Sequence, residues 1–296
     1  MLCILYVNVV GALLSVMGLL VERLLPATAA RRWVWVVLIP TSLFLPGLYR
    51  FRHNAPVADW WAPTASLDTI INSVWNTASL LLLLWGVANL LRVAYVVWSS
   101  RRQRDNLTPT IVDGVPVVVT DGVGPATVGL LRSHVLVPRW VLAMPGVQRR
   151  YVLRHEEEHR SAHDARLLFL ASLFILLAPW NLVLWWELRR LRLAVEMDCD
   201  NRVVGALGDA PAYGELLFKV AQAASRGPRL QPALLGVGML EHRLTMLLAP
   251  TQLRRVQRIV LAGVAFALLV LVLSMPHPVL GHGPHAHAAM NQMAQR

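Results

Sequence analysis

The sequence predicts a mostly α-helical membrane protein, with about four transmembrane helices and a small α+β domain between the third and the fourth. Three observations carry this prediction. Apolar residues make up 56% of the 296 residues, and the mean hydropathy of +0.50 is high for a soluble globular protein. Four separate apolar runs approach the roughly 20 residues that a helix needs to cross a bilayer. Short β-branched runs before the last of them, separated by Asp-Gly and Gly-Pro, indicate strands.

The four apolar runs are the predicted transmembrane helices. They cover residues 2–25, 33–49, 78–98 and 259–275. No basic region precedes the first run, so we predict a retained span rather than a signal peptide. The chain then divides into a three-span membrane region, a central domain, a fourth transmembrane helix and a short extracytoplasmic tail with four histidines, at 1–104, 105–255, 256–275 and 276–296. We expect the tail to be a disordered end rather than a metal site.

Arginine positions predict how the chain lies in the membrane. The formal net charge is +11, and Lys219 is the only lysine. Positive charge gathers on the cytoplasmic side of membrane proteins, and the clusters at 31–32, 101–104 and 254–258 share one side if the N-terminus is outside. Arg50 and Arg52 oppose this assignment but are fewer. The central domain is thus predicted to be cytoplasmic, and no direct binding of nucleic acid is expected, because the arginines flank apolar runs.

Residues 110–137 predict a small sheet that precedes a charged helix. This sheet either only supports the helix or also offers an edge strand that holds an extended peptide by main-chain pairing. The sequence leaves both alternatives open.

The charged helix contains the pattern H-E-x-x-H, formed by His155, Glu156 and His159. Residues four apart on an α-helix point the same way, so the two imidazoles can bind one Zn²⁺. Glu156 then lies where it can take a proton from a water that the metal activates. The alternative is a charged surface helix that matches the pattern by chance.

Three neighbours of the motif are expected to stay out of the metal site. Glu157 and Glu158 do not occupy the second position of the pattern and are predicted to be solvated. His163 stands eight residues after His155, which on a helix is about 12 Å. A zinc–nitrogen bond is about 2 Å long, so these two histidines cannot share one ion.

A catalytic zinc ion bound by two histidines needs a third protein ligand and one open position for water. Glu196 lies on a later predicted helix and is the candidate ligand, which makes the domain gluzincin-like. Asp200 follows one turn later on the same face, where it could accept a hydrogen bond from the second nitrogen of a ligand histidine. The alternative for both carboxylates is a solvated helix face. Cys199 is expected to be a small core residue rather than a ligand.

The apolar stretch at 167–186 lies between the motif and Glu196 and is long enough to cross a membrane. A single crossing would place Glu196 on the opposite side from His155. Pro179 and Asn181 interrupt the stretch, so we predict two apolar pieces that pack against other helices or enter the membrane and return. The alternative is a full span beside a motif without function.

Further motifs accompany these residues along nearly the whole chain. They are Gly129-Leu130-Leu131-Arg132, Val135 to Pro138, Asp164 five residues after His159, Trp180-Asn181, Glu196-x-x-Cys199-Asp200, Tyr213-x-x-Leu216-Leu217 and Arg243-Leu244. Together they resemble the BlaR/MecR type of membrane metallopeptidase, a family that includes antibiotic-sensing signal transducers. The order of three spans, zinc domain and fourth span is also similar.

The resemblance implies a zinc endopeptidase of the bacterial plasma membrane that cleaves a cytoplasmic protein. The expected substrate is a BlaI/MecI-like transcriptional repressor or the chain itself. Membrane lipid is the expected surrounding, and the chain could form a homodimer. Tyr213, His163 and His242 are candidates for stabilising the oxyanion of the reaction. The alternatives are a quality-control protease similar to the HtpX type and a non-catalytic transducer with a structural zinc ion.

Three departures from that family's pattern stand out. Ser133 and Leu182 occupy positions where proline is usual. After the fourth apolar run the sequence has only about twenty residues and no Ser-x-x-Lys, where relatives carry a penicillin-binding sensor domain. Direct acylation by a β-lactam is therefore not expected from these residues.

Overall fold

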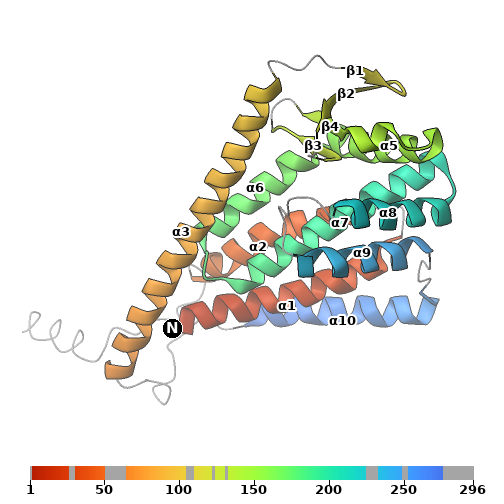
Figure 1. Ribbon diagram of the computed structural model, residues 1–296. Helices are drawn as coiled ribbons and strands as arrows, with labels where there is room; N and C mark the ends of the chain where they lie inside the picture. Colours follow the sequence, from red (N-terminus) through yellow and green to blue (C-terminus); the bar gives the residue numbers. More distant parts are fainter. Residues whose placement is uncertain are drawn as a thin grey trace, which may run out of the picture.

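The computed structural model is mostly helical, with one small sheet at one end of a long helical bundle (Figure 1). It describes residues 2–26, 31–50, 65–104, 110–121, 124–130, 133–224, 233–248 and 253–275. The predicted histidine-containing tail lies outside these residues.

Four long helices cover most of each predicted span. They are α1 (Leu2–Leu24), α2 (Arg32–Arg50), α3 (Ala65–Arg104) and α10 (Arg255–Ser274). Within the described residues, two segments are long and apolar enough to cross a membrane: Leu5–Leu24 in α1, with a mean hydropathy of 1.9, and α10, with 2.5. The apolar part of α2, Arg32–Pro46, is shorter. Two candidate spans are thus present, and the count of four stays a prediction.

The apolar stretch at 167–186 is broken, as predicted. Helix α6 (Asp164–Leu177) ends before Pro179, and α7 (Leu182–Leu207) begins after Asn181. The Asn181 side chain accepts hydrogen bonds from the main-chain N–H groups of Val183 and Leu184, which is the usual N-cap interaction. The two helices pack against each other as a hairpin.

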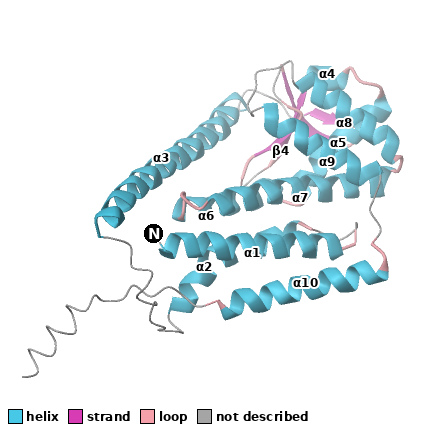
Figure 2. Ribbon diagram, turned by 90° about the horizontal axis from the view of Figure 1, so that it is seen from below, coloured by secondary structure: helices cyan, strands magenta, loops and turns pink. Residues whose placement is uncertain are grey.

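The α6–α7 hairpin packs against α1 and α2, and α10 packs on α1 (Figure 2). The apolar side chains of the hairpin share one core with those helices. The buried members from the hairpin are Ala171, Ile175, Ala178, Leu184, Leu188, Leu191, Ala194 and Val195. The central domain is therefore in direct contact with the predicted membrane region through a continuous apolar core.

A four-stranded sheet precedes the H-E-x-x-H helix, as the sequence predicted. The strands are β1 (Thr110–Val112), β2 (Val115–Thr120), β3 (Ala126–Val128) and β4 (His134–Pro138), in the order β1-β2-β4-β3. Asp113 and Gly114 form the β1–β2 turn with φ values of 48° and 82°, a conformation that favours Asp-Gly. Strand β3 pairs antiparallel with β4 and is an edge of the sheet.

A second core joins the sheet to the helices around it. Helices α4 (Arg139–Leu142) and α5 (Gly146–Ser161) follow the sheet, and α8 (Ala210–Ala224) and α9 (Ala233–Leu248) follow α7. Buried residues of this core include Val135, Leu153 and Cys199. Because α7 contributes to both cores, one continuous helix connects the bundle to the H-E-x-x-H helix.

Candidate metal centre

Helix α5 brings the two histidines of the motif together. His155 and His159 lie one turn apart, and their Nε2 atoms are 3.2 Å apart. Both side chains are 14% exposed. The short separation follows from helical geometry, since residues four apart are neighbours on one face.

Glu196 approaches the same two nitrogens from α7. Its Oε2 atom lies 3.6 Å from Nε2 of His155, and its Oε1 atom lies 3.7 Å from Nε2 of His159. Ligand atoms about 2.0–2.1 Å from a tetrahedral zinc ion are roughly 3.3 Å from each other. The three donors are therefore placed near the separations that zinc requires, and their role as ligands stays a prediction.

Cys199 offers a second grouping of donor atoms. One donor atom from each of His155, His159 and Cys199 lies within 4.8 Å of the others. The Cys199 sulfur lies 3.3 Å from Nδ1 of His155, the nitrogen that the Tyr213 hydroxyl also contacts. It is fully buried in the second core, which agrees with the expected core position. Glu196 stays the predicted third ligand, because its carboxylate oxygens face the Nε2 atoms of both histidines.

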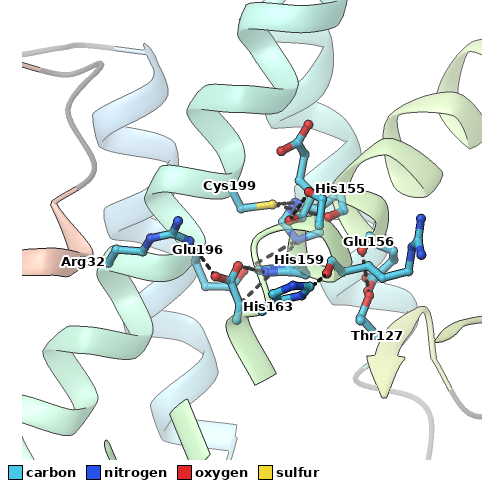
Figure 3. A network of polar contacts seen from close by, with 12 residues as sticks. Arg32, Thr127, His155, Glu156, His159, His163, Glu196 and Cys199 are labelled. Atoms are coloured by element: carbon cyan, nitrogen blue, oxygen red, sulfur yellow. Dashed lines mark hydrogen bonds and ion pairs between the residues drawn. The ribbon is translucent and has the colours of Figure 1, made fainter. Parts of the chain in front are cut away.

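Glu156 lies beside these donors and is held by the edge strand (Figure 3). The Thr127 hydroxyl on β3 lies 3.0 Å from Oε2 of Glu156 and 2.7 Å from its main-chain oxygen. Glu156 is buried, with 6% of its surface exposed. The sheet thus positions the predicted proton acceptor, and sequence reasoning had not identified Thr127.

The expectation that Glu158 is solvated is wrong. Its carboxylate is buried and pairs with Arg154 at 2.5 Å and with Arg202 at 2.7 Å. Arg202 comes from α7, so its position was not apparent from the local pattern. Glu157 is partly exposed and pairs with Arg160 at 2.5 Å. Both side chains bond to arginines rather than to the histidines.

Asp164 is the direct hydrogen-bond partner of His159. Its Oδ2 atom lies 2.8 Å from Nδ1 of that histidine, and its Oδ1 atom lies 2.6 Å from the Arg32 guanidinium. A carboxylate on the second nitrogen fixes the orientation of a ligand histidine. The sequence signal for Asp164 was only its position just after the motif, and the role of Arg32 had no local signal.

The predicted support from Asp200 reaches His155 through a third residue. Oδ1 of Asp200 lies 3.5 Å from Nδ1 of His155, which is long for a hydrogen bond. The Tyr213 hydroxyl on α8 lies 2.9 Å from that nitrogen and donates to Asp200 at 2.7 Å. Burial and the Asp200 carboxylate raise the pKa of Tyr213 well above its ordinary value, so the hydroxyl keeps its proton.

Arg243 on α9 completes this network. Its guanidinium donates two hydrogen bonds to Asp200, both 2.7 Å long, and a third nitrogen lies 2.9 Å from Oε2 of Glu196. Burial alone would raise the pKa of Glu196, but Arg243 and the two imidazoles outweigh burial and hold that pKa well below its usual range. Glu196 is therefore ionised, as a metal ligand must be.

The imidazoles also respond to this charged environment. Burial acts to lower the pKa of His155 and His159. The Cys199 sulfur and the carboxylates of Glu196 and Asp164 act in the opposite direction and raise both pKa values above the ordinary value. The metal-free site thus attracts positive charge, which fits a set of donors for a cation.

Two of the three oxyanion candidates do not face the donor atoms. Tyr213 uses its hydroxyl on the Nδ1 side of His155. His242 lies on α9 near Glu22, Arg190 and Arg31, at the bundle.

His163 follows the end of α5 at Ser161 and has a φ of 56°. The motif helix therefore ends before His163, and the expectation that His155 and His163 lie on one continuous helix is wrong.

A comparison with protein families identifies a match over most of the chain. A family model described as BlaR1 peptidase M56 matches residues 1–247. Among curated proteins, no match is found.

Proposed function

The chain belongs to the BlaR1 peptidase M56 family, and from this membership and the geometry of the donor atoms we propose that it is a zinc-dependent endopeptidase of a cell membrane. The observation that carries the proposal is the placement of His155, His159 and Glu196. The two Nε2 atoms lie 3.2 Å apart, and the two Glu196 oxygens lie 3.6 Å from that of His155 and 3.7 Å from that of His159, respectively. Two imidazoles and one carboxylate are the protein ligands of many catalytic zinc sites.

Glu156 is the proposed general base. When bound, zinc acts as a Lewis acid toward water and the substrate carbonyl. Glu156 accepts the proton of the attacking water and returns it to the leaving amine. Its burial and its hydrogen bond from Thr127 hold the carboxylate in one position, which favours reaction because the acceptor is already oriented.

Strand β3 is the proposed platform for the substrate. It is an edge strand, and an edge strand can pair with an extended peptide through main-chain hydrogen bonds. Thr127 on this strand contacts Glu156, so a peptide paired with β3 would pass beside the general base. This contact favours the peptide-binding alternative over a sheet that only supports α5.

The orientation of the membrane helices supports a cytoplasmic site. The beginning of α2, with Arg31 and Arg32, lies against the metal centre, and α10 begins with arginines at the same end of the bundle (Figure 2). Helix α3 ends at Arg104 shortly before β1. The arginine clusters thus gather at the end that carries the site, as expected for the cytoplasmic side.

The proposed substrate is a cytoplasmic regulator, by analogy with the signal-transducing members of the family. A BlaI/MecI-like repressor and the chain itself are the two expected substrates. Cleavage of either would pass a signal from the membrane to transcription.

Metal analysis and cleavage assays on the purified full chain test this function. We expect about one zinc ion per chain and cleavage of casein, used as an unfolded probe, or of the chain itself. Glu156→Gln should keep the zinc ion and lose cleavage. Glu157→Gln, on the same helix, should keep both. The proposal would be overturned if the wild type held no zinc or if Glu156→Gln cleaved at the full rate. Zinc without cleavage in the wild type would also overturn it and would support a non-catalytic transducer.

A further inference from the structure

Arg32 connects the second predicted span to the metal centre. It is the first residue of α2, and its guanidinium points from that helix toward the polar network around the histidines (Figure 3). Its Nη1 atom donates a hydrogen bond to Oδ1 of Asp164 at 2.6 Å. The two side chains are only 13% and 3% exposed, so water does not compete strongly for the pair.

Asp164 uses both oxygens in this arrangement. Oδ1 faces Arg32, and Oδ2 lies 2.8 Å from Nδ1 of His159. The position of the carboxylate therefore depends on the guanidinium as well as on the imidazole. A change in the position of Arg32 would be transmitted to His159 through one rigid group.

The first turn of α2 is fixed to the ligand-bearing helix by a second contact. The carboxylate of Asp198 accepts hydrogen bonds from the main-chain N–H groups of Arg31 and Arg32, both 3.1 Å long. Asp198 lies two residues after Glu196 on α7. The main chain of Arg32 thus attaches to α7, which carries Glu196. Its side chain attaches to Asp164, the first residue of α6, which in turn contacts His159 on α5.

A second arginine approaches Asp164 but cannot replace Arg32. Arg202 lies 3.8 Å from Oδ2 of Asp164, beyond hydrogen-bond distance. Its Nε atom instead donates to Glu158 at 2.7 Å. Within the described residues, Arg32 is the arginine that makes the close contact with Asp164.

We infer that Arg32 is a positioning residue of the metal centre, which acts through Asp164 to orient the ligand His159. This inference rests on the proposed function. The metal site then includes a side chain from the membrane hairpin α1–α2, and residues 105–255 alone lack it. A shift of α2 relative to α5 would alter the orientation of His159, which gives the membrane helices a direct route to the reaction centre.

Metal binding by the full chain in detergent tests the inference without relying on activity. Partners of ligand histidines typically change metal affinity by about 10–100-fold, and we expect Arg32→Gln to lower zinc affinity by about tenfold in chelator competition. It should also change the visible spectrum of the cobalt-substituted site, which reports ligand geometry. Arg32→Lys keeps the charge and should recover part of the affinity. In a double mutant with Asp164→Asn, Arg32→Gln should add little, because both changes break one connection.

The matched control is Arg149→Gln. Arg149 lies on the same helix as the histidines, but it pairs with Asp113 in the β1–β2 turn, away from them. The control should keep wild-type affinity and spectrum. Wild-type affinity and spectrum in Arg32→Gln, or full additivity with Asp164→Asn, would overturn the inference while leaving the peptidase proposal intact. If Arg32→Gln does not fold, wild-type affinity and spectrum in Asp164→Asn would overturn it, because the inferred connection passes through that carboxylate. A wild-type chain that binds no zinc would instead overturn the proposed function.

Discussion

The hydroxyl oxygen of Tyr213 lies 2.9 Å from Nδ1 of His155. The Tyr213 hydroxyl donates its proton to Asp200. With Nε2 bound to the proposed zinc ion, Nδ1 would carry the ring proton and donate it to the hydroxyl oxygen. Arg243 then links Asp200 to Glu196. His155 and Glu196, two proposed ligands from different helices, are therefore joined by a continuous series of polar contacts. Tyr213 on α8 and Arg243 on α9 supply the intervening side chains.

We predict that Tyr213→Phe weakens zinc binding by about tenfold, the lower end of the range for such supports. The variant removes the acceptor for His155 and the donor for Asp200 while keeping the ring. Chelator competition measures the effect. Tyr151→Phe is the control, because Tyr151 packs on Tyr213 but donates to the main-chain oxygen of Gly208. An equal loss in both variants, or none in Tyr213→Phe, would contradict the assigned role.

A second prediction concerns the contact between Thr127 and Glu156. Thr127→Val keeps the shape of the side chain but removes the hydroxyl, whose one proton is shared between two oxygens of Glu156. Losing a hydrogen bond to a charged group costs roughly 1.5–3 kcal/mol, so we expect kcat to fall by about tenfold or more while zinc content stays constant. Thr127→Ser should restore most of the rate. Unchanged kcat in Thr127→Val would show that the general base is held by other contacts.

Local spacing was sufficient to predict the part of the site that depends on one helix. His155 and His159 face the same way because they are four residues apart, and this follows from helix geometry alone. Glu196 required a chemical argument, since two histidines leave a zinc site incomplete. The structure brings its carboxylate to both Nε2 atoms.

The supporting contacts could not be predicted, because they depend on how separate helices pack. Tyr213 stands 58 residues after His155, and Arg32 stands 132 residues before Asp164. Glu158 was expected to be solvated for the same reason: its partner Arg202 lies on another helix. No periodicity within one segment records such neighbours.

Element boundaries show the same distinction. The interruption at Pro179 and Asn181 was predicted because both residues act locally on the helix. Helix α3, in contrast, runs from Ala65 to Arg104, well beyond the apolar run from 78 to 98. Hydropathy marks the apolar part of a helix, whereas main-chain hydrogen bonding continues through polar residues.

A third prediction concerns Glu187, a buried acid of the bundle. Glu187 is fully buried, and Ser15 and Ser42 each donate a hydrogen bond to its Oε1 atom at 2.8 Å. Glu187→Ala leaves a cavity and removes the acceptor of both hydroxyls, so we expect a loss of roughly 2–5 kcal/mol in stability. Glu187→Gln keeps an acceptor oxygen and should cost much less. Thermal unfolding of the full chain in detergent measures both, and equal stability of the two variants would contradict this account.

The last prediction concerns protons released when zinc binds. The pKa values of His155 and His159 are raised in the metal-free site, although burial opposes the shift. Their Nε2 atoms are 3.2 Å apart, so these two nitrogens can share one proton but cannot each carry one. Zinc needs both nitrogens unprotonated, and we expect release of about one proton per ion.

Because the raised pKa values keep that proton bound near neutral pH, zinc affinity should increase by about tenfold for each pH unit between about pH 6 and about pH 8. Calorimetry in buffers of different ionisation enthalpy measures the proton count. His163→Gln removes an exposed histidine outside the donor set and should release the same number of protons. A zinc affinity that does not change with pH over this range would show that His155 and His159 hold no such shared proton.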